Sequence, residues 1–219
     1  MSSCKGEGQL LSYPHPAHRE DRASQVIDLC RQYPLALFCT VIECQQYATR
    51  IPIAIDVHEG KIVRARGHLN ANNPQAVNLH GRDSLIAFCG PDAYISPFWR
   101  AAHDRGPTWD YTAVYLRGRI TVRNDDEFFR TLIEDIAALG EATDPELVAE
   151  RAWSLDDVTD DYITRLRPYL ITFEIKVTNQ EQIFKCHQDF SAKDRRAIHS
   201  HLMRSSRDFS RRIASLIVT

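Results

Sequence analysis

Residues 112–122, TAVYLRGRITV, decide the fold class of this chain. Apolar and polar side chains alternate along the stretch, and several of its residues are β-branched or aromatic. A period of two sends successive side chains to opposite faces of a β-strand. The pattern therefore predicts a strand with one buried face, which must pair with other strands to form a sheet.

Working outward, five further segments rich in apolar and β-branched residues are predicted as strands: 35–42, 48–57, 61–69, 84–89 and 170–177. Glu59-Gly60 predicts the turn between the second and third of these. Apolar periodicity and capping residues predict helices over 19–33, 125–139, 145–153, 156–166 and 191–217. These elements indicate an α+β domain built on an antiparallel barrel or sheet. The chain has neither a Rossmann glycine motif nor a P-loop.

The composition indicates a soluble, cytoplasmic protein. The 219 residues are 43% hydrophobic and 26% charged with a net charge of −2, which favours neither nucleic acid nor a membrane surface as a partner. The six cysteines form no C-x-x-C pair and fit a reducing compartment, although Cys39 and Cys44 leave a zinc site open. We expect a loose leader at 1–18, a cofactor-binding domain at 19–190 and a charged C-terminal helix at 191–219.

Four segments carry more polar and aromatic side chains than a scaffold needs. Residues 67–75, GHLNANNPQ, crowd amides and a histidine at a strand end, which favours either helix capping or a ligand. Residues 90–99, GPDAYISPFW, predict a rigid aromatic turn, and 107–111, PTWDY, bring rings and a carboxylate to a strand start. Such rings stack on flat ligands or pack a corner of the core. Residues 184–191, FKCHQDFS, predict either an anion site or a capping turn before the last helix.

In this order and spacing, the segments GHLNANNPQ, CGPDAYISPFW, PTWDYTAVYLRGRI and AWSLDD resemble the PaiB family of FMN-binding negative transcriptional regulators. The resemblance runs from about Tyr13 to Ile198. It implies an FMN-binding split β-barrel, antiparallel and Greek-key-like, with flanking helices. It also implies a homodimer with two cofactor sites at the subunit interface.

Two segments depart from the pattern of that family. Its T-H-L-P segment is here Thr49-Arg50-Ile51-Pro52, and its K-L-S-Q-N-R segment is here residues 185–190, KCHQDF, with Phe190 in place of a basic residue. The FMN phosphate needs hydrogen-bond donors and positive charge, and Arg50 can supply both. We expect Arg50 to face the cofactor pocket and bind an anionic group; the alternative is a surface ion pair, with Glu43 as one partner.

One branch of the family, the piperazate synthases, binds haem and closes N5-hydroxy-L-ornithine into L-piperazate with formation of an N–N bond. By resemblance, haem b and an amino-acid substrate are expected here, with FMN in a regulator or flavoprotein as the alternative and a binding module with a decayed site as a third. The expected catalytic residues are Lys185, Asp110 and Tyr111. The expected cofactor-binding residues are His68, Arg50, Asn70, Asn73, Tyr94, Trp99 and Trp109.

The predicted axial haem ligand is His68, because imidazole is the usual neutral ligand of haem iron and His68 lies in the most specific segment. Gly67 before it leaves room for a planar ligand. His58 beside the Glu59-Gly60 turn is the second candidate, and His187 is assigned to capping contacts at a helix start. The alternative for His68 is a hydrogen bond within the asparagine-rich loop.

Overall fold

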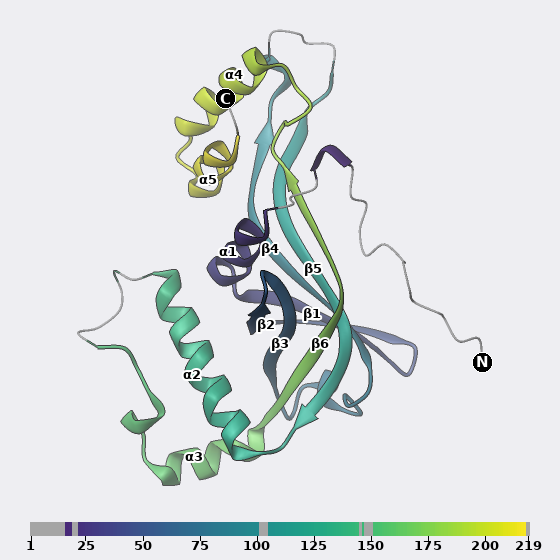
Figure 1. Cartoon of the computed structure of the whole chain (residues 1–219), viewed down its shortest axis with the longest axis vertical. Helices are drawn as coiled ribbons and strands as arrows, with labels where there is room; N and C mark the ends of the chain where they lie inside the picture. The colour runs from purple at the N-terminus through teal and green to yellow at the C-terminus, as the bar shows by residue number, and fades with distance from the viewer. Residues whose placement is uncertain (1–15, 19–21, 101–104, 145, 147–150, 218–219) are drawn as a thin grey trace.

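Six antiparallel strands close into a barrel in the computed structural model, which describes residues 16–18, 22–100, 105–144, 146 and 151–217. The order around the barrel is β1-β2-β3-β6-β5-β4 (Figure 1). The strands are β1 (Leu35–Ile42), β2 (Gln45–His58), β3 (Lys61–Asn70), β4 (Asp83–Ile95), β5 (Thr108–Arg123) and β6 (Leu170–Lys185). The predicted α+β domain with an antiparallel barrel is confirmed.

Two tight turns set the registers of the first three strands. Glu59 and Gly60 both have positive φ angles, as a two-residue hairpin turn between right-twisted strands requires, and the predicted turn is confirmed. Glu43 and Cys44 have the same geometry between β1 and β2, with φ angles of 51° and 65°. No glycine or asparagine signals that first turn in the sequence.

Three strands outlast the barrel and form an arm. The register of β4 and β5 shifts between Cys89 and Asp92, and β4 then continues as far as Ile95. The prediction of a rigid turn over the whole of 90–99 is therefore wrong, since only Pro97–Trp99 forms a short 3₁₀ turn. β6 likewise runs beyond its predicted end and pairs with β5 as far as Lys185. In Figure 1 the arm leads from the barrel toward the C-terminal helices.

The core fills the barrel and is closed by a helix. The alternating inward residues of the strands are fully buried and include Phe38, Ile53, Ile86, Leu116 and Phe173. Helix α1 (Ala23–Gln32) packs its own apolar stripe, Val26, Ile27, Leu29 and Cys30, onto this cluster. The hydrophobic contribution of one such side chain is roughly 1.5–3 kcal/mol, so the barrel and α1 depend on each other for stability.

Helix α2 (Asp126–Thr143) lies on the outside of the barrel (Figure 1). It packs Phe128 and Leu132 against Ala54 of β2. The short helix α3 (Asp160–Leu166) follows and joins Leu155 and Phe129 in a smaller cluster. The predicted helix at 145–153 falls mostly outside the described residues, and its last three residues are not helical.

The C-terminal segment forms two helices, so the prediction of one long helix over 191–217 is wrong. Helix α4 (Ala192–Met203) and helix α5 (Asp208–Leu216) meet at a bend. Ile198 and Ile213 are completely buried in one cluster with Ala93 and Ile95 of the arm. A single straight helix could not bring both of its halves onto the arm, so the chain folds back. Within the described residues, no helix is long and apolar enough to cross a membrane.

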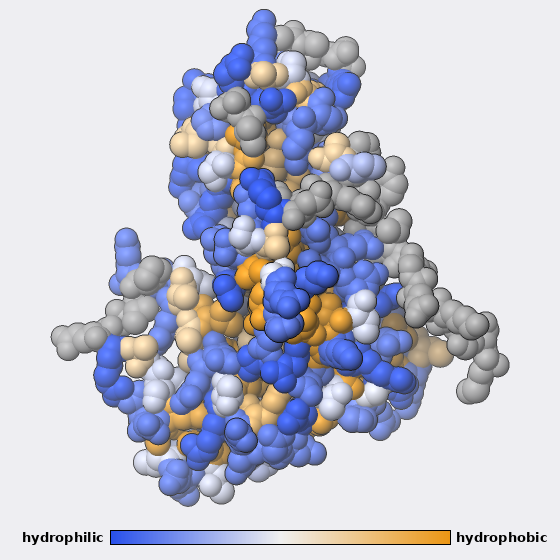
Figure 2. All heavy atoms as spheres, in the orientation of Figure 1, coloured by the Kyte–Doolittle hydropathy of each residue, from blue (hydrophilic) through white to orange (hydrophobic). Residues whose placement is uncertain are grey.

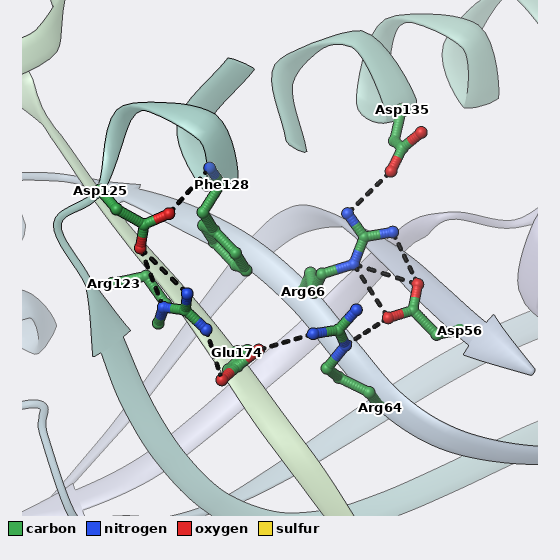
Figure 3. Close-up of polar contacts among 8 residues, drawn as sticks. All are labelled: Asp56, Arg64, Arg66, Arg123, Asp125, Phe128, Asp135 and Glu174. Atoms are coloured by element: carbon green, nitrogen blue, oxygen red, sulfur yellow. Dashed lines mark hydrogen bonds and ion pairs between the residues drawn. The ribbon is translucent and has the colours of Figure 1, made fainter. Parts of the chain in front are cut away.

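A chain of ion pairs connects α2 to the barrel wall and links β2, β3 and β6 within that wall (Figure 3). Arg66 of β3 binds Asp56 of β2 at 2.6 Å and Asp135 of α2 at 2.7 Å. Arg64 joins Asp56 to Glu174 of β6, which accepts a second hydrogen bond from Arg123 at 2.9 Å. Each guanidinium spans two elements, so the network couples the position of the helix to the register of the sheet.

Arg123 also binds Asp125, the residue that caps α2. The Asp125 carboxylate accepts a hydrogen bond from the backbone N–H of Phe128 at 3.0 Å and an ion pair from Arg123 at 3.0 Å. The predicted start of this helix is confirmed to within one residue. The corner between β5 and α2 is therefore held by the same network that binds the helix to the barrel.

We expect Gly118→Ala to destabilise the fold by about 1–3 kcal/mol, as overpacking in a core does. A Cβ at Gly118 would lie 2.1 Å from the carbonyl oxygen of Lys176 and 2.6 Å from Ile175 Cγ2, so β5 and β6 would have to separate. Urea unfolding measures the change. The matched control is Gly140→Ala in α2, where nothing lies within 4 Å and alanine favours the helix. Equal effects of the two substitutions would contradict this account.

We expect Asp56→Asn to lower stability at neutral pH and to flatten the loss of stability in acid. Burial raises the pKa of Asp56, but hydrogen bonds and ion pairs from Arg66 and Arg64 outweigh it, so the pKa lies below its ordinary value. A depressed carboxyl pKa contributes stability that is present above the unfolded pKa of about 3.9 and is lost as the pH falls through the folded pKa. Unfolding measured from pH 7 to pH 3 tests this, with Asp144→Asn as the control; a gap between wild type and variant that does not shrink in acid would refute it.

Candidate functional site

A groove with a volume of 810 Å³ runs over the outer face of the barrel. It is bounded by α1 and Phe209 of α5 on one side and by Ile136 and Thr143 of α2 on the other. Its floor is formed by strands β1, β2 and β4, and we call it the β1–β4 groove. Its volume falls within the roughly 300–1,000 Å³ of sites that hold small molecules and cofactors.

The floor of this groove is apolar although it lies outside the barrel. Ala36 and Phe38 point into the core, so Leu35 and Leu37 point outward and are 48% and 36% exposed. Ala87 pairs with Leu37 across the strands and extends the same surface. Figure 2 shows hydrophobic side chains gathered near the middle of the molecule, between the lobe of α2 and that of α4 and α5. An exposed apolar strip of this kind is typical of a ligand-binding groove or a protein–protein interface.

The side chain of Arg50 lies at this floor and has no carboxylate partner among the described residues. Arg50 lies opposite Leu37 in the register of β1 and β2, and its side chain makes one hydrogen bond, 3.3 Å long, to the backbone oxygen of Leu35. Among the described residues Arg50 forms no ion pair, so the alternative of a surface pair with Glu43 is not realised. Asp92, the one acid among the described residues that line the groove, is held by Arg207 at 2.7 Å. The guanidinium of Arg50 is therefore available to an anionic ligand.

An aromatic pair closes one side of the groove. The rings of Tyr33 and Phe209 meet edge to face, with centroids 5.9 Å apart. Both residues line the groove. The groove thus offers a flat apolar floor, an aromatic wall and one cation, which is the set of surfaces that a conjugated ring with an anionic tail requires.

His68 lies beside this groove and is chemically unusual. Its neighbours Gly67 and Leu69 are on the buried face of β3. Because successive residues of a strand face opposite sides, His68 lies on the outer face. Its Nδ1 atom is buried with no hydrogen-bond partner in the described structure, and burial lowers the pKa of the imidazole below its ordinary value. The antiparallel register places it next to Pro52, which lines the groove. A neutral imidazole with an unused nitrogen is the form that binds a metal.

Asn70 and Asn73 near His68 form hydrogen bonds within their own loop and to β2. Asn73 accepts a hydrogen bond from the backbone N–H of Gln75 at 2.9 Å and donates one to Thr49 at 3.1 Å. Asn70 accepts from the backbone N–H of Asn72 at 2.8 Å. Asn73 caps the 3₁₀ turn at Pro74–Ala76, so the capping interpretation of this segment is confirmed for Asn73. The other interpretation left open in the sequence, a hydrogen bond from His68 into this loop through Nδ1, is not present.

The predicted aromatic and catalytic residues lie mostly on the arm. Tyr94 and Trp109 are cross-strand neighbours, with ring centroids 5.9 Å apart. Lys185 donates hydrogen bonds to the Thr108 hydroxyl at 2.5 Å and to the Trp109 carbonyl at 2.7 Å. Tyr111 pairs with Lys185 in the register of β5 and β6. These contacts tie β6 to β5 at the end of the arm, and they occupy the Lys185 ammonium.

Trp99 and His58 lie apart from that group. The ring of Trp99 stacks on His201 of α4, with centroids 5.1 Å apart and a 7° angle between planes. The His58 side chain is 75% exposed beside Glu59, as its position at a turn predicted.

Asp110 and His187 form a buried pair that the sequence did not reveal. Asp110 Oδ2 lies 2.6 Å from His187 Nδ1, and both side chains are almost completely buried. His187 has a φ angle of 56°, which turns the chain at the end of β6. The pair joins residues 77 positions apart, so no local spacing could predict it. His187, assigned from sequence to capping, is instead part of this pair, and the second oxygen of Asp110 and the Nε2 of His187 have no partner among the described residues.

Phe190, which stands where the resembling family has a basic residue, covers this pair. Its ring centroid lies 4.4 Å from that of His187. The guanidinium groups of Arg100 and Arg105 lie over the ring of Phe190 at 5.2 Å and 4.9 Å. Two arginines therefore place positive charge over the face of Phe190 at this end of the arm.

One chain does not gather all the predicted site residues. Asn70 pairs with Leu170 at the start of β6, whereas Lys185 lies at its end, so the whole 16-residue strand separates the His68 segment from the arm. Arg50 lies in the groove between them. The described residues contain no cluster of three or more His, Cys, Asp or Glu side chains that could hold a metal ion, which leaves the Cys39–Cys44 zinc site without further ligands.

Comparison with known proteins identifies the family. Residues 12–179 match the family described as "Putative FMN-binding domain", and the chain belongs to this family. An uncharacterised protein of Emericella nidulans is 26% identical, over 94% of this chain and 96% of its own length. The Bacillus subtilis "Protease synthase and sporulation protein PAI 2" is 25% identical, over 82% of this chain and 85% of its own.

A solved structure has the same fold. The FAD and haem binding protein from Mycobacterium smegmatis superposes with a TM-score of 0.51 at 16% sequence identity, over 77% of this chain and 73% of its own. The predicted FMN-binding split β-barrel with flanking helices is confirmed.

Proposed function

We propose that this protein is a flavoprotein that binds FMN in the β1–β4 groove. The observation that carries the proposal is the combination of an apolar floor and an unpaired arginine within one groove of 810 Å³. Membership of an FMN-binding family supports the choice of cofactor. The isoalloxazine ring is flat and conjugated, and the phosphate is a dianion, so the two parts of FMN match the two kinds of surface.

Each part of the groove has a task in this proposal. Leu35, Leu37 and Ala87 exclude water from one face of the ring. Arg50 binds the phosphate through its planar guanidinium, whose five donors suit a tetrahedral anion. When bound, FMN supplies hydride or single-electron transfer. Asp92 is held away from the phosphate by its ion pair with Arg207, which removes a repulsive charge from the groove.

We further propose that a second copy of the chain covers the cofactor, as the family resemblance implies. The floor of the groove is open, with Leu35 48% exposed, so a flat ligand would keep one face in water in a single chain. A homodimer would bury that face and could also bring the arm of one subunit near the groove of the other. Light scattering at micromolar concentration tests this, and a monomeric mass would refute it.

We expect Arg50→Ala to weaken FMN binding about tenfold or more, because charge-assisted hydrogen bonds contribute about 1.5–3 kcal/mol each. Quenching of flavin fluorescence during titration of the flavin-free protein measures the affinity. Riboflavin, which lacks the phosphate, is the matched ligand, and its affinity should not change with the substitution. Arg165→Ala on α3 is the control for a lost surface charge. Equal loss for FMN and riboflavin would remove Arg50 as the phosphate-binding residue.

A second candidate function is that of a haem-dependent piperazate synthase, and the unpartnered imidazole of His68 favours it specifically. When bound to His68, haem would activate the hydroxylamine nitrogen of N5-hydroxy-L-ornithine. The base for the α-amine would come from the Asp110, Tyr111 and Lys185 group. Because Lys185 and Asp110 are engaged within one chain, this candidate has less support than FMN.

We expect His68→Ala to abolish a histidine-ligated haem spectrum in protein loaded with haem, and added imidazole to restore it. His58→Ala is the matched control, because His58 is exposed at a turn on the same hairpin. Visible absorption after gel filtration also separates the two candidates, since haem has a sharp Soret band and flavin has broad bands. An unchanged Soret band in His68→Ala, with loss in His58→Ala, would transfer the ligand to His58.

A further inference from the structure

A second large cavity lies on the barrel, at a place distinct from the β1–β4 groove. Its volume is 910 Å³, and it shares no lining residue with that groove. Cys39 and Val41 of β1 and Leu85 of β4 give it an apolar side, and Tyr47 of β2 adds a ring. Three arginines line it, Arg82, Arg117 and Arg119, and we call it the arginine cavity.

Two of these arginines, Arg82 and Arg119, are held by backbone oxygens and not by carboxylates. The Nε of Arg82 donates to the carbonyl of Asn78 at 3.1 Å, and the Nε of Arg119 donates to that of Gly81 at 2.8 Å. In the part of the chain that the structure describes, neither they nor Arg117 form an ion pair. The guanidinium groups of Arg82 and Arg119 are therefore oriented by the turn at 78–81, while their terminal nitrogens have no carboxylate partner among the described residues.

The arginines of the neighbouring barrel wall differ in this respect. Arg64, Arg66 and Arg123 each bind two carboxylates in the network of Figure 3. The arginines of β5 therefore differ from one another. Arg123 at the end of the strand forms ion pairs, whereas Arg117 and Arg119 line the cavity and form none among the described residues. Among the described residues, the arginines that line the arginine cavity therefore lack the ion pairs that their neighbours on the barrel wall form.

The cross-strand register adds to the positive charge. Arg119 lies directly opposite Lys176 of β6, a pairing of like charges that destabilises a sheet. Asp83 of β4 lies opposite Arg119 and is the one acid among the described residues that line the cavity. No ion pair joins Asp83 to Arg119 among the described contacts. Among the described lining residues, which do not include Lys176, three arginines against one aspartate leave two net positive charges, on a chain whose net charge is −2.

A smaller hollow of 460 Å³ adjoins the cavity and shares Arg82 and Arg119 with it. His80 lines that hollow, and its Nδ1 accepts a hydrogen bond from the backbone N–H of Val122 at 3.2 Å. Because Nδ1 accepts this hydrogen bond, the other ring nitrogen, Nε2, is the one that can donate to a ligand. Arginine and histidine donors thus meet at one edge.

We propose that the arginine cavity binds a phosphate monoester whose organic part is flat and apolar. A phosphate monoester carries a charge of about −1.5 to −2 at neutral pH, which matches the two net positive charges, whereas one carboxylate would neutralise only half. Cys39, Val41, Leu85 and Tyr47 supply the surface for the organic part. The site is separate from the groove proposed for FMN, so it would hold a substrate or effector in addition to that cofactor.

Phenyl phosphate is the probe, titrated into the full chain by calorimetry at 150 mM salt. It should bind with one site per chain, inorganic phosphate should bind more weakly, and phenol should not bind. Arg117→Gln should weaken phenyl phosphate about tenfold or more, because it removes a charge-assisted contact. Arg196→Gln on α4 should leave the affinity unchanged, and a thermal melt confirms that both variants are folded.

A second titration separates this site from the FMN groove. Protein saturated with FMN should bind phenyl phosphate with the same affinity and without release of flavin fluorescence. Competition with FMN that is equal in wild type and Arg117→Gln would overturn the proposal, because the phosphate would then be bound in the β1–β4 groove. An affinity that is equal in Arg117→Gln and wild type would overturn it as well. If FMN fails to bind while phenyl phosphate binds with the predicted dependence on Arg117, the proposed function fails and the arginine cavity stands.

Discussion

The structure depends on β6, which pairs with β3 along one edge and β5 along the other and so closes the barrel. Its first seven residues face β3, while pairing with β5 continues to Lys185. Closure demands close contact at Gly118, where the carbonyl of Lys176 occupies the place of a side chain. Because every strand is then paired on both sides within the barrel, the sheet leaves no open edge there.

The unequal lengths of the strands create the surfaces that ligands can use. β4, β5 and β6 outlast β1 and β3, so they continue as an arm that α4 and α5 cover from one side. On the outer face of β1 and β4, helices α1 and α2 border the β1–β4 groove on either side. The apolar floor of the groove lies between the two helices. The apolar faces of α1 and α2 pack against other parts of the barrel. The helices therefore leave this part of the outer face uncovered, and the groove lies there.

Charge is distributed unevenly over the outer wall of this barrel. Around Arg66 each cation has carboxylate partners from two elements, and this arrangement stabilises the fold without leaving donors for a ligand. Among the described residues, Arg50, Arg82 and Arg119 have backbone oxygens as partners and no carboxylate. A guanidinium without a carboxylate partner keeps donors for an anionic ligand, which is the reason these two places are the candidates for binding anions.

The sequence by itself determined the class of fold and most of the strands. Alternation along 112–122, the turn at Glu59-Gly60 and the cap at Asp125 are local signals, and each acts over a few residues. The family resemblance pointed to the flavin-binding barrel for the same reason, because its motifs are short and contiguous. Strand ends were less predictable, since the extension of β4 past Gly90 depends on a bulge and on a partner strand that local propensity does not describe.

Only the tertiary structure decided which side chains meet. Asp110 and His187 pair across 77 residues, and the buried Nδ1 of His68 has no hydrogen-bond partner among the described residues. The C-terminal segment bends because both of its halves reach the arm. The groove around Arg50 and the arginine cavity each join strands that are distant in the chain. These features arise from register and closure, which are set by contacts between remote segments, so residue type and spacing along the chain do not contain them.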